Sequence, residues 1–329
     1  TFDPIHRGHI TAAQAAAQQL GLDLLLLIPA SIPPHKALPE GGADAAQRLE
    51  MATLATAELS CPAQVLDVEV RRQGKSYTAD TLRTLRRQYP EDELWLLMGT
   101  DMFLSLQDWH EPQEILRLVR VAAFSRTGDP EQQRFARQRA YLEKTFGAQV
   151  TVVENPHVVD ISSTRLRQLL PEGREYLPEA VYGYILRQRL YGTHAELKHL
   201  TPEELRPIAL SFLKPKRMPH VLGTEQEAIR LARRYGADET DARIAALLHD
   251  CTKKLDMEQQ LALCRRYDIR LDELEQHALK LLHAKTGAAV ARDIFGVKDA
   301  VYEAIRWHTT GKPDMTLLEK VIYLADYIE

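Results

Sequence analysis

The sequence has few cysteines, no long apolar run and only a small net charge. Cys61, Cys251 and Cys264 have neither the paired spacing of a zinc site nor the density of a disulfide framework, so we expect a reducing, cytoplasmic environment. The longest apolar run, around residues 24–28, is far too short to cross a bilayer, and no signal peptide is recognisable. The formal net charge of −4 is shared by both halves of the chain, which argues against a nucleic-acid polymer or a membrane surface as partner.

The composition is that of an ordinary globular protein, and 329 residues are enough for two domains. Up to about residue 192, short apolar runs typical of strands alternate with helical patterns. This order predicts a Rossmann-like α/β domain over residues 1–192, with a mostly parallel sheet and ligands beyond the carboxyl ends of its strands. We expect its strands at 24–28, 65–70, 94–98, 121–124 and 150–153, and helices at 9–20, 44–59 and 78–88.

From about residue 196 the strand-like runs vanish and helical periodicity continues almost to the end. The pattern predicts an all-α domain over residues 196–329. We expect its helices at 202–213, 217–235, 239–249, 257–267, 271–282, 284–294, 298–308 and 315–328.

The first candidate site is the string Thr1-Phe-Asp-Pro-Ile-His-Arg-Gly-His9. His6 and His9 stand just before an Ala/Gln-rich helix, where two imidazoles, backbone N–H groups and the helix dipole can approach a triphosphate. Phosphoryl and nucleotidyl transfer depend on positioning and charge stabilisation, which such groups supply. The string is short enough to be incidental on its own.

A second string, Ile161-Ser-Ser-Thr-Arg-Leu-Arg167, follows a predicted strand and opens a helix. Its hydroxyls can cap the helix and bind phosphate, and Arg167 can stabilise charge that develops there. A plain helix cap with a solvated arginine is the local alternative, and the co-occurrence with the first string favours the functional interpretation.

Together these strings resemble the HxGH nucleotidyltransferases, and more narrowly bacterial nicotinate mononucleotide adenylyltransferase, over residues 1–192. The resemblance includes Pro33-Pro-His-Lys36, Ser76-Tyr-Thr-Ala-Asp-Thr-Leu82, Met98-Gly-Thr-Asp101 and Trp109. It implies ATP with Mg²⁺, nicotinate mononucleotide as acceptor, and His6, His9 and Arg167 as catalytic groups. The binding residues that it implies are Thr1, Phe2, Lys36, Thr78, Thr81, Gly99, Asp101, Trp109, Arg126, Ser162, Ser163 and Thr164.

Within that resemblance, Lys36 is expected near the acceptor's phosphate, and Trp109 is expected to stack on the pyridine ring. Arg126 is either an ATP contact or a solvated loop arginine. The family pattern has a core strand and a Gly-Gly turn before the position of Thr1, so we expect this sequence to be a fragment of a longer chain whose phosphate cradle is incomplete as given.

The second candidate site centres on His249-Asp250, at the end of an apolar helical run. Imidazoles and carboxylates that converge on a helical core form a mixed N/O site suited to iron or manganese, and a two-metal centre would activate water and neutralise phosphate charge. Any one of these residues could instead be a satisfied core residue. The ligands expected in sequence order are His220, His249, Asp250, His283, His308 and Asp326.

This order resembles the HD-domain phosphohydrolases, and the strings around it resemble the YqeK-type family over residues 196–329. The resemblance implies symmetrical hydrolysis of diadenosine tetraphosphate to two ADP at a di-metal centre of iron or manganese. It also implies a catalytic role for Asp250 and a phosphate contact for Lys253.

We therefore expect a bifunctional enzyme, with its oligomeric state open and a homo-oligomer among the options. Nicotinamide mononucleotide or phosphopantetheine remains an alternative acceptor for the first half, and a general nucleotide phosphohydrolase remains an alternative for the second. A nucleotide-binding scaffold with an inactive first domain is the alternative from another functional class.

Overall fold

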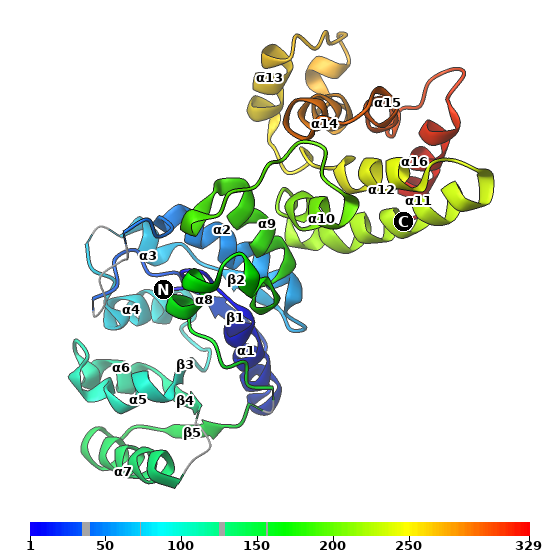
Figure 1. Ribbon diagram of the computed structural model, residues 1–329. Helices are drawn as coiled ribbons and strands as arrows, with labels where there is room; N and C mark the ends of the chain where they lie inside the picture. The colour runs from blue at the N-terminus through cyan, green and yellow to red at the C-terminus, as the bar shows by residue number, and fades with distance from the viewer. Residues whose placement is uncertain (35–39, 73, 125–128, 156) are drawn as a thin grey trace. The chain divides into compact units, whose positions relative to one another are not determined.

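The structure is a computed structural model that describes residues 1–34, 40–72, 74–124, 129–155 and 157–329 (Figure 1). It divides into two units, Thr1–Leu177 and Pro178–Glu329. The first contains parallel strands with helices and the second is helical, which confirms both expected fold classes. The division lies before the junction expected between residues 192 and 196, because α9 (Glu179–Gln188) packs against α10 (Pro202–Leu210).

Parallel strands form the centre of the first unit. One sheet pairs β1 (Leu25–Leu27) with β2 (Ala63–Val65), and the other has the order β3 (Trp95–Gly99), β4 (Arg120–Phe124), β5 (Val150–Val153). Gly99 pairs with Phe124, and Phe124 pairs with Val153, so the carboxyl ends of these three strands meet at one edge. The helices of this unit are α1 (Arg7–Leu20), α2 (Ala45–Ala55), α3 (Val68–Arg71), α4 (Thr78–Gln88), α5 (Thr100–Leu104), α6 (Pro112–Leu118), α7 (Asp129–Phe146) and α8 (Ser163–Leu169).

Side chains of β4 alternate between two apolar clusters, as the two-residue period of a strand requires. Ala122 packs with Ala15 and Ala16 of α1, whereas Val121 and Ala123 pack with the cluster that α4 and α6 help to form. Helices therefore cover both faces of this sheet (Figure 1). Small alanine side chains on α1 let that helix, which begins at the first candidate site, lie close to β4 and β5.

The strand expected at residues 65–70 is wrong beyond Val65. β2 ends at Val65, and Val68–Arg71 forms the short helix α3. The Nε of Arg71 donates to the Asp67 carboxylate over 2.7 Å, a pairing four residues apart that suits a helical turn. Alternating apolar residues in so short a run do not distinguish a strand from one helical turn.

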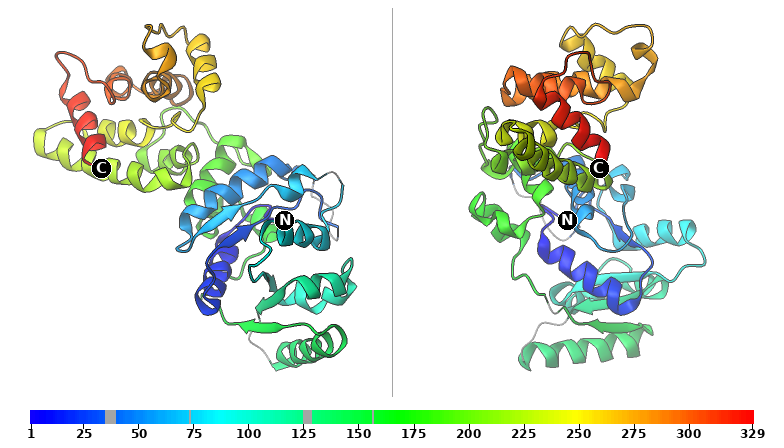
Figure 2. Two further views of the ribbon diagram at one scale, coloured as in Figure 1. Left: turned by 180° about the vertical axis from the view of Figure 1, so that it is seen from behind. Right: turned by 90° about the vertical axis from the view of Figure 1, so that its right-hand side faces the viewer.

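The second unit is a helical bundle with an alanine-rich core. Its further helices are α11 (Met218–Tyr235), α12 (Glu239–Leu248), α13 (Met257–Arg266), α14 (Leu279–Phe295), α15 (Asp299–Trp307) and α16 (Leu317–Ile328). Ala242, Ala245 and Ala246 of α12 are fully buried, so neighbouring helices approach this central helix closely. In both views of Figure 2, α11 and α12 (yellow-green) run beside α16 (red), in agreement with their packing contacts.

The expectation of two helices at 271–282 and 284–294 is wrong. One continuous helix, α14, covers Leu279–Phe295, and the chain before it forms turns and a short 3₁₀ helix, Glu275–His277. The backbone N–H of Asp272 donates to the Glu275 carboxylate and that of Glu275 donates to Asp272, which closes a local turn in place of a helix. Among the described residues, no helix has the length and apolar character needed to traverse a lipid bilayer.

Candidate functional sites

The first site is built where the N-terminal segment enters α1. His6 is the residue before the helix and is almost fully buried, and its backbone N–H donates to Nδ1 of His9 over 3.2 Å. The two imidazole rings lie 3.7 Å apart between centroids, and the edge of Phe2 packs against His9 at 5.1 Å. Because Nδ1 of His9 accepts this hydrogen bond, its ring proton is on Nε2.

Gly8 is required by the space around these rings. A Cβ atom at this position would lie 3.0 Å from Nδ1 of His6 and 3.1 Å from the carbonyl oxygen of Val159. Both distances are at the short limit of ordinary contacts, so a side chain here would push His6 or the chain before α8 away. The lack of space explains why the residue before His9, at the start of α1, is a glycine.

Helix α8 is hydrogen-bonded to the segment in front of His6. The hydroxyl of Ser163 donates to the carbonyl of Pro4 over 3.0 Å, and Nη1 of Arg167 donates to the carbonyl of Asp3 over 2.6 Å. Arg167 also reaches the hydroxyl of Thr164 at 3.4 Å. Ser162 caps the helix by accepting the N–H of Arg165. The two strings that the sequence singled out thus meet in space, although about half the chain separates them.

Burial keeps both histidines uncharged near neutral pH. It lowers the pKa of His6 to about 4. It also lowers the pKa of His9 well below the usual value, and the neighbouring His6 adds to this effect. The sequence left open whether these imidazoles are neutral or protonated. With pKa values this low they are neutral hydrogen-bonding groups, while Arg167 brings a positive charge to Asp3, in the segment before His6.

Fully buried Arg48, which the sequence analysis did not single out, fixes the backbone beside the site. Its guanidinium donates to the carbonyls of Ala43 over 2.6 Å, Ala30 over 2.6 Å and Ser31 over 2.8 Å. These carbonyls flank residues 35–39 on both sides. Lys36 and Arg126, two of the expected binding residues, lie outside the described part of the chain.

Several of the expected binding residues lie at the starts of helices or at the ends of strands. Gly99 ends β3 and Asp101 is exposed in α5, while Thr78 begins α4. Trp109 is half-buried against the core cluster that contains Leu106. Tyr77 precedes Thr78 and His110 follows Trp109, and the rings of Tyr77 and His110 contact each other at a tilt, with their centroids 4.3 Å apart. The Thr78 and Trp109 segments are therefore neighbours.

Thr81 and Thr1 have contrasting surroundings. The hydroxyl of buried Thr81 donates to the Glu69 carboxylate over 2.7 Å, and burial raises the pKa of that carboxyl despite this hydrogen bond. Thr81 is therefore engaged inside the fold. Thr1 is exposed, and Phe2, with a φ of 56°, turns the chain toward α1.

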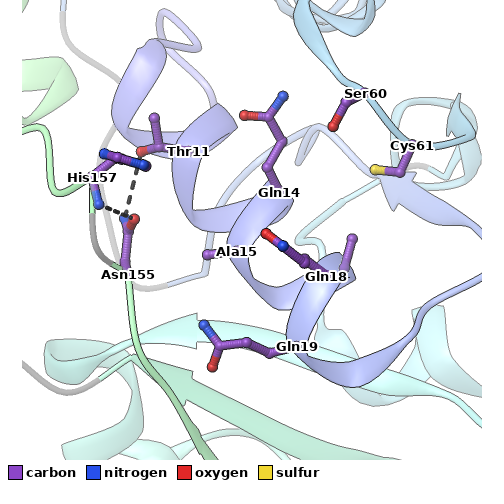
Figure 3. Close-up of a pocket in the computed structure, with 10 residues that line it drawn as sticks. Thr11, Gln14, Ala15, Gln18, Gln19, Ser60, Cys61, Asn155 and His157 are labelled. Atoms are coloured by element: carbon purple, nitrogen blue, oxygen red, sulfur yellow. Dashed lines mark hydrogen bonds between the residues drawn. The ribbon is translucent and has the colours of Figure 1, made fainter.

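A pocket of about 500 Å³ lies along the outer side of α1 (Figure 3). Figure 3 shows successive turns of the helix facing Ser60 and Cys61 on one side and Asn155 on the other. Asn155 donates to the hydroxyl of Thr11, and its own oxygen accepts the N–H of His157. The residues that line the pocket are mostly neutral and polar, and neither His6 nor His9 is among them.

The second site is the convergence of all six expected ligands in the helical unit. Three groups of ligand atoms each lie within 4.8 Å of one another: His220 with His249 and Asp250, His249 with His308 and Asp326, and Asp250 with His283 and His308. They come from α11, the end of α12, α14, the end of α15 and α16. The first and third groups share Asp250, which is fully buried between them.

Backbone carbonyls orient three of the imidazoles. Nδ1 of His249, His283 and His308 each faces the carbonyl oxygen of the residue three positions earlier, at 2.6, 2.8 and 2.7 Å. A proton on Nδ1 makes each of these a hydrogen bond and leaves the lone pair of Nε2 facing the cluster. This is the tautomer needed to bind a metal through Nε2, and the backbone carbonyls favour it.

The donor set fits a divalent cation. Nε2 of His249 and Oδ1 of Asp250 are buried, and within the described ranges their contacts are ion pairs without the geometry of a hydrogen bond. Nε2 of His283 and Nε2 of His308 are 3.1 Å apart, and His283 is 3.2 Å from Oδ1 of Asp250. Nitrogen lone pairs and carboxylate oxygens gathered in this way suit iron, manganese or zinc.

Strong electrostatic coupling accompanies this arrangement. Burial favours neutral His249, but the carboxylates of Asp250 and Asp326 outweigh it and raise its pKa to about 9. Burial also opposes ionisation of Asp250, yet His249 and its other partners hold its pKa far below the usual range. His308 shows the opposite balance, since burial and the charges of its histidine neighbours lower its pKa to about 3.

Two further side chains at this site escaped the sequence analysis. Nε of Arg217 donates to Oδ2 of Asp250 over 2.5 Å, and the hydroxyl of Thr309 lies 3.1 Å from Nε2 of His308. Arg217 precedes His220 by less than one helical turn, but an arginine at such a position is too common on helices to have indicated a site. Lys253, which was singled out, has its Nζ 3.1 Å from Oδ1 of Asp250.

Two family models match the chain. The cytidylyltransferase-like model matches residues 1–169, and the HD domain model matches residues 217–329. The chain belongs to the cytidylyltransferase-like family. This cytidylyltransferase-like chain also carries a C-terminal HD domain, so the family assignment expected for each half is confirmed, and the narrower YqeK type stays a prediction.

Curated relatives match the cytidylyltransferase-like half. A probable nicotinate-nucleotide adenylyltransferase of Gloeobacter violaceus is 42% identical over 202 residues, which covers 59% of this chain and 94% of that protein. A protein of the same name from Shewanella sp. (strain MR-7) is 39% identical over 207 residues, 58% of this chain and 95% of its own. A crystal structure from Clostridium acetobutylicum, described as a predicted HD superfamily hydrolase involved in NAD metabolism, is 40% identical, covers 40% of this chain and 69% of that one, and has a TM-score of 0.38.

Proposed function

We propose that the first unit transfers an adenylyl group from ATP to nicotinate mononucleotide, giving nicotinate adenine dinucleotide and pyrophosphate. The observation that carries the proposal is the pair of hydrogen bonds from Ser163 and Arg167 to Pro4 and Asp3, which joins the start of α8 to the segment before His6. The names of the relatives that match this half support the choice of acceptor.

In this reaction a phosphate oxygen of the acceptor attacks the α-phosphorus of ATP, and pyrophosphate leaves. Neutral His6 and His9 would donate hydrogen bonds to phosphate oxygens, His9 from Nε2 because its Nδ1 is engaged by the His6 backbone. Arg167, whose guanidinium reaches back to Thr164 at the start of α8, would add positive charge. Mg²⁺ bound with ATP would neutralise further phosphate charge.

The test is pyrophosphate release by His9→Ala with nicotinate mononucleotide as acceptor. Loss of one aligned donor in a transfer site costs about a hundredfold or more in rate, so a fall of at least that order is expected with the fold intact. Thr11→Ala on the same helix is the control and should keep the activity. Unchanged transfer by His9→Ala would sink the assignment, and faster reaction with nicotinamide mononucleotide or phosphopantetheine would overturn the acceptor.

The second unit, in this proposal, hydrolyses dinucleoside polyphosphates, with diadenosine tetraphosphate cut symmetrically to two ADP. The convergence of His220, His249, Asp250, His283, His308 and Asp326 carries it. A pair of iron or manganese ions would supply activated water and neutralise phosphate charge. The chain's own contribution is to aim Nε2 of its histidines inward, to keep Asp250 ionised and to offer Lys253 to a phosphate.

Metal content and product analysis test this second proposal together. His249→Ala should lose most bound metal and nearly all hydrolysis, whereas exposed His277→Ala should keep both. Chromatography should find ADP as the product. AMP together with ATP would contradict symmetrical cleavage, and retention of metal and activity by His249→Ala would refute the metal site. Hydrolysis without any adenylyl transfer would favour the scaffold alternative for the first unit.

A further inference from the structure

A positively charged side chain contacts each carboxylate oxygen of Asp250. Nε of Arg217 donates to Oδ2 over 2.5 Å, while Nζ of Lys253 is 3.1 Å from Oδ1. Arg217 also places Nη2 at 3.6 Å from Oδ1 of Asp326, so its guanidinium spans two of the expected ligands. The carboxylate of Asp250 is fully buried, whereas the Arg217 side chain is 32% exposed. Arg217 thus lies between the buried cluster and solvent.

The bonding of Arg217 differs from that of a structural arginine in this protein. Fully buried Arg48 uses its guanidinium on backbone carbonyls and holds a loop. Among the described residues, the guanidinium of Arg217 contacts only the carboxylates of Asp250 and Asp326. A guanidinium has five N–H donors in a planar fork, so most of its donors stay available to another acceptor.

We propose that Arg217 is a phosphate-binding residue of the second unit, held by Asp250 and Asp326 until a divalent cation occupies their oxygens. A cation bound by these carboxylates offsets the negative charge that attracts the guanidinium, and the fork can then bind a substrate phosphate in two-pronged fashion. The inference rests on the proposed hydrolase function and adds to it the group that recognises the phosphate.

Two equilibria should respond to Arg217→Gln in opposite directions. This variant removes a positive charge that competes with the metal for Asp250. The metal-free variant should therefore bind Mn²⁺ at least as tightly as the unaltered protein. Full relief of the repulsion between Arg217 and Mn²⁺ would raise the affinity about threefold to tenfold. The Mn²⁺-loaded protein should bind inorganic phosphate about tenfold or more weakly, because a charge-assisted contact is lost. Titration calorimetry of the full chain measures both.

Two companion variants keep the test interpretable. Arg230→Gln removes an exposed arginine of α11 whose partner is Glu227, and it should change neither titration. Arg217→Lys keeps the charge without the fork, so it should recover part of the phosphate affinity and return Mn²⁺ affinity to the original value.

The outcomes separate the inference from its alternatives. Parallel loss of Mn²⁺ and phosphate affinity in Arg217→Gln would show that Arg217 merely holds Asp250 in place and would overturn the proposal, as would unchanged phosphate affinity. Neither titration uses a nucleotide. If phosphate binding behaves as expected while diadenosine tetraphosphate is not hydrolysed, the inference on Arg217 stands and the proposed substrate fails.

Discussion

At the scale of single residues, Gly8 shows how little room the first site leaves. Gly8→Ala would place a methyl carbon 3.0 Å from His6 and 3.1 Å from the carbonyl oxygen of Val159. We expect adenylyl transfer to fall by about tenfold to a hundredfold, since small displacements of aligned groups are costly in such sites. The melting temperature should change little, because alanine is the better helix former. Activity equal to the unaltered protein would contradict this account of the site.

The buried imidazole of His6 also makes the stability of the first unit depend on pH. Its pKa is about 4 in the folded state, whereas an unfolded histidine titrates near 6.5. As pH falls from 6.5, the unfolded state takes up the proton first, so folding loses stability down to about pH 4. The free energy of unfolding falls by about 3 kcal/mol over this range, and His6 causes no loss above pH 6.5.

His6→Gln removes this titration and should give a flatter stability profile between pH 6.5 and 4. Urea unfolding can be followed by fluorescence in a Trp307→Phe background, where the remaining tryptophans, Trp95 and Trp109, both lie in the first unit. Equal slopes for the two proteins over this range would show that His6 is not held neutral by burial.

Residue order and local strings sufficed to predict which histidines and aspartates gather in the second unit. They could not indicate Arg217 or Thr309, because an arginine or threonine beside a ligand is ordinary on any helical surface. Arg48 was missed for a related reason: its three carbonyl partners come from two separate loop segments, and only the folded chain brings them together. The chemical roles of the expected residues stay predictions until the variants are measured.

At the scale of elements, α9 and α10 are in close backbone contact at Gly183. A Cβ atom on Gly183 would lie 1.8 Å from the carbonyl oxygen of Pro207, where neither backbone can yield. Gly183→Ala should therefore destabilise the second unit by about 3 kcal/mol or more, as overpacking of a rigid contact does. Thermal unfolding followed by circular dichroism measures it.

Gly223→Ala is the matched control for that change. There an added Cβ atom would meet only the side chain of Glu329, which can rotate away, and alanine is favoured over glycine in a helix by about 1 kcal/mol. This variant should be neutral or slightly stabilising. Similar destabilisation by both substitutions would mean that the α9–α10 contact has no special role.

Most elements could be predicted from period and flanking residues, and the errors have local causes. Helix α4 matches the expected range 78–88, because its apolar residues repeat with a clear helical period. The segment 65–70 has too few residues for the period to decide. The segment 271–278 has a helical composition, but reciprocal hydrogen bonds between Asp272 and Glu275 close a turn there.

At the scale of the whole molecule, the position of α9 changes where the chain should be cut. Val181 and Ile185 of this helix are fully buried, and α9 packs against α10 of the second unit. A fragment of residues 178–329 should fold, remain monodisperse and bind Mn²⁺. A fragment of residues 196–329 lacks α9, exposes apolar surface on α10, and should aggregate or unfold at lower temperature. Equal stability of the two fragments would favour the junction expected between residues 192 and 196.

The hydrogen bonds from His249, His283 and His308 to backbone carbonyls have a consequence for how the helical unit evolves. Two of these histidines end a helix, so one imidazole both closes a helix terminus and points a nitrogen at the cluster. A mutation that frays such a terminus also misdirects a ligand. We therefore expect variants that weaken either helix terminus to lose thermal stability and ion affinity together.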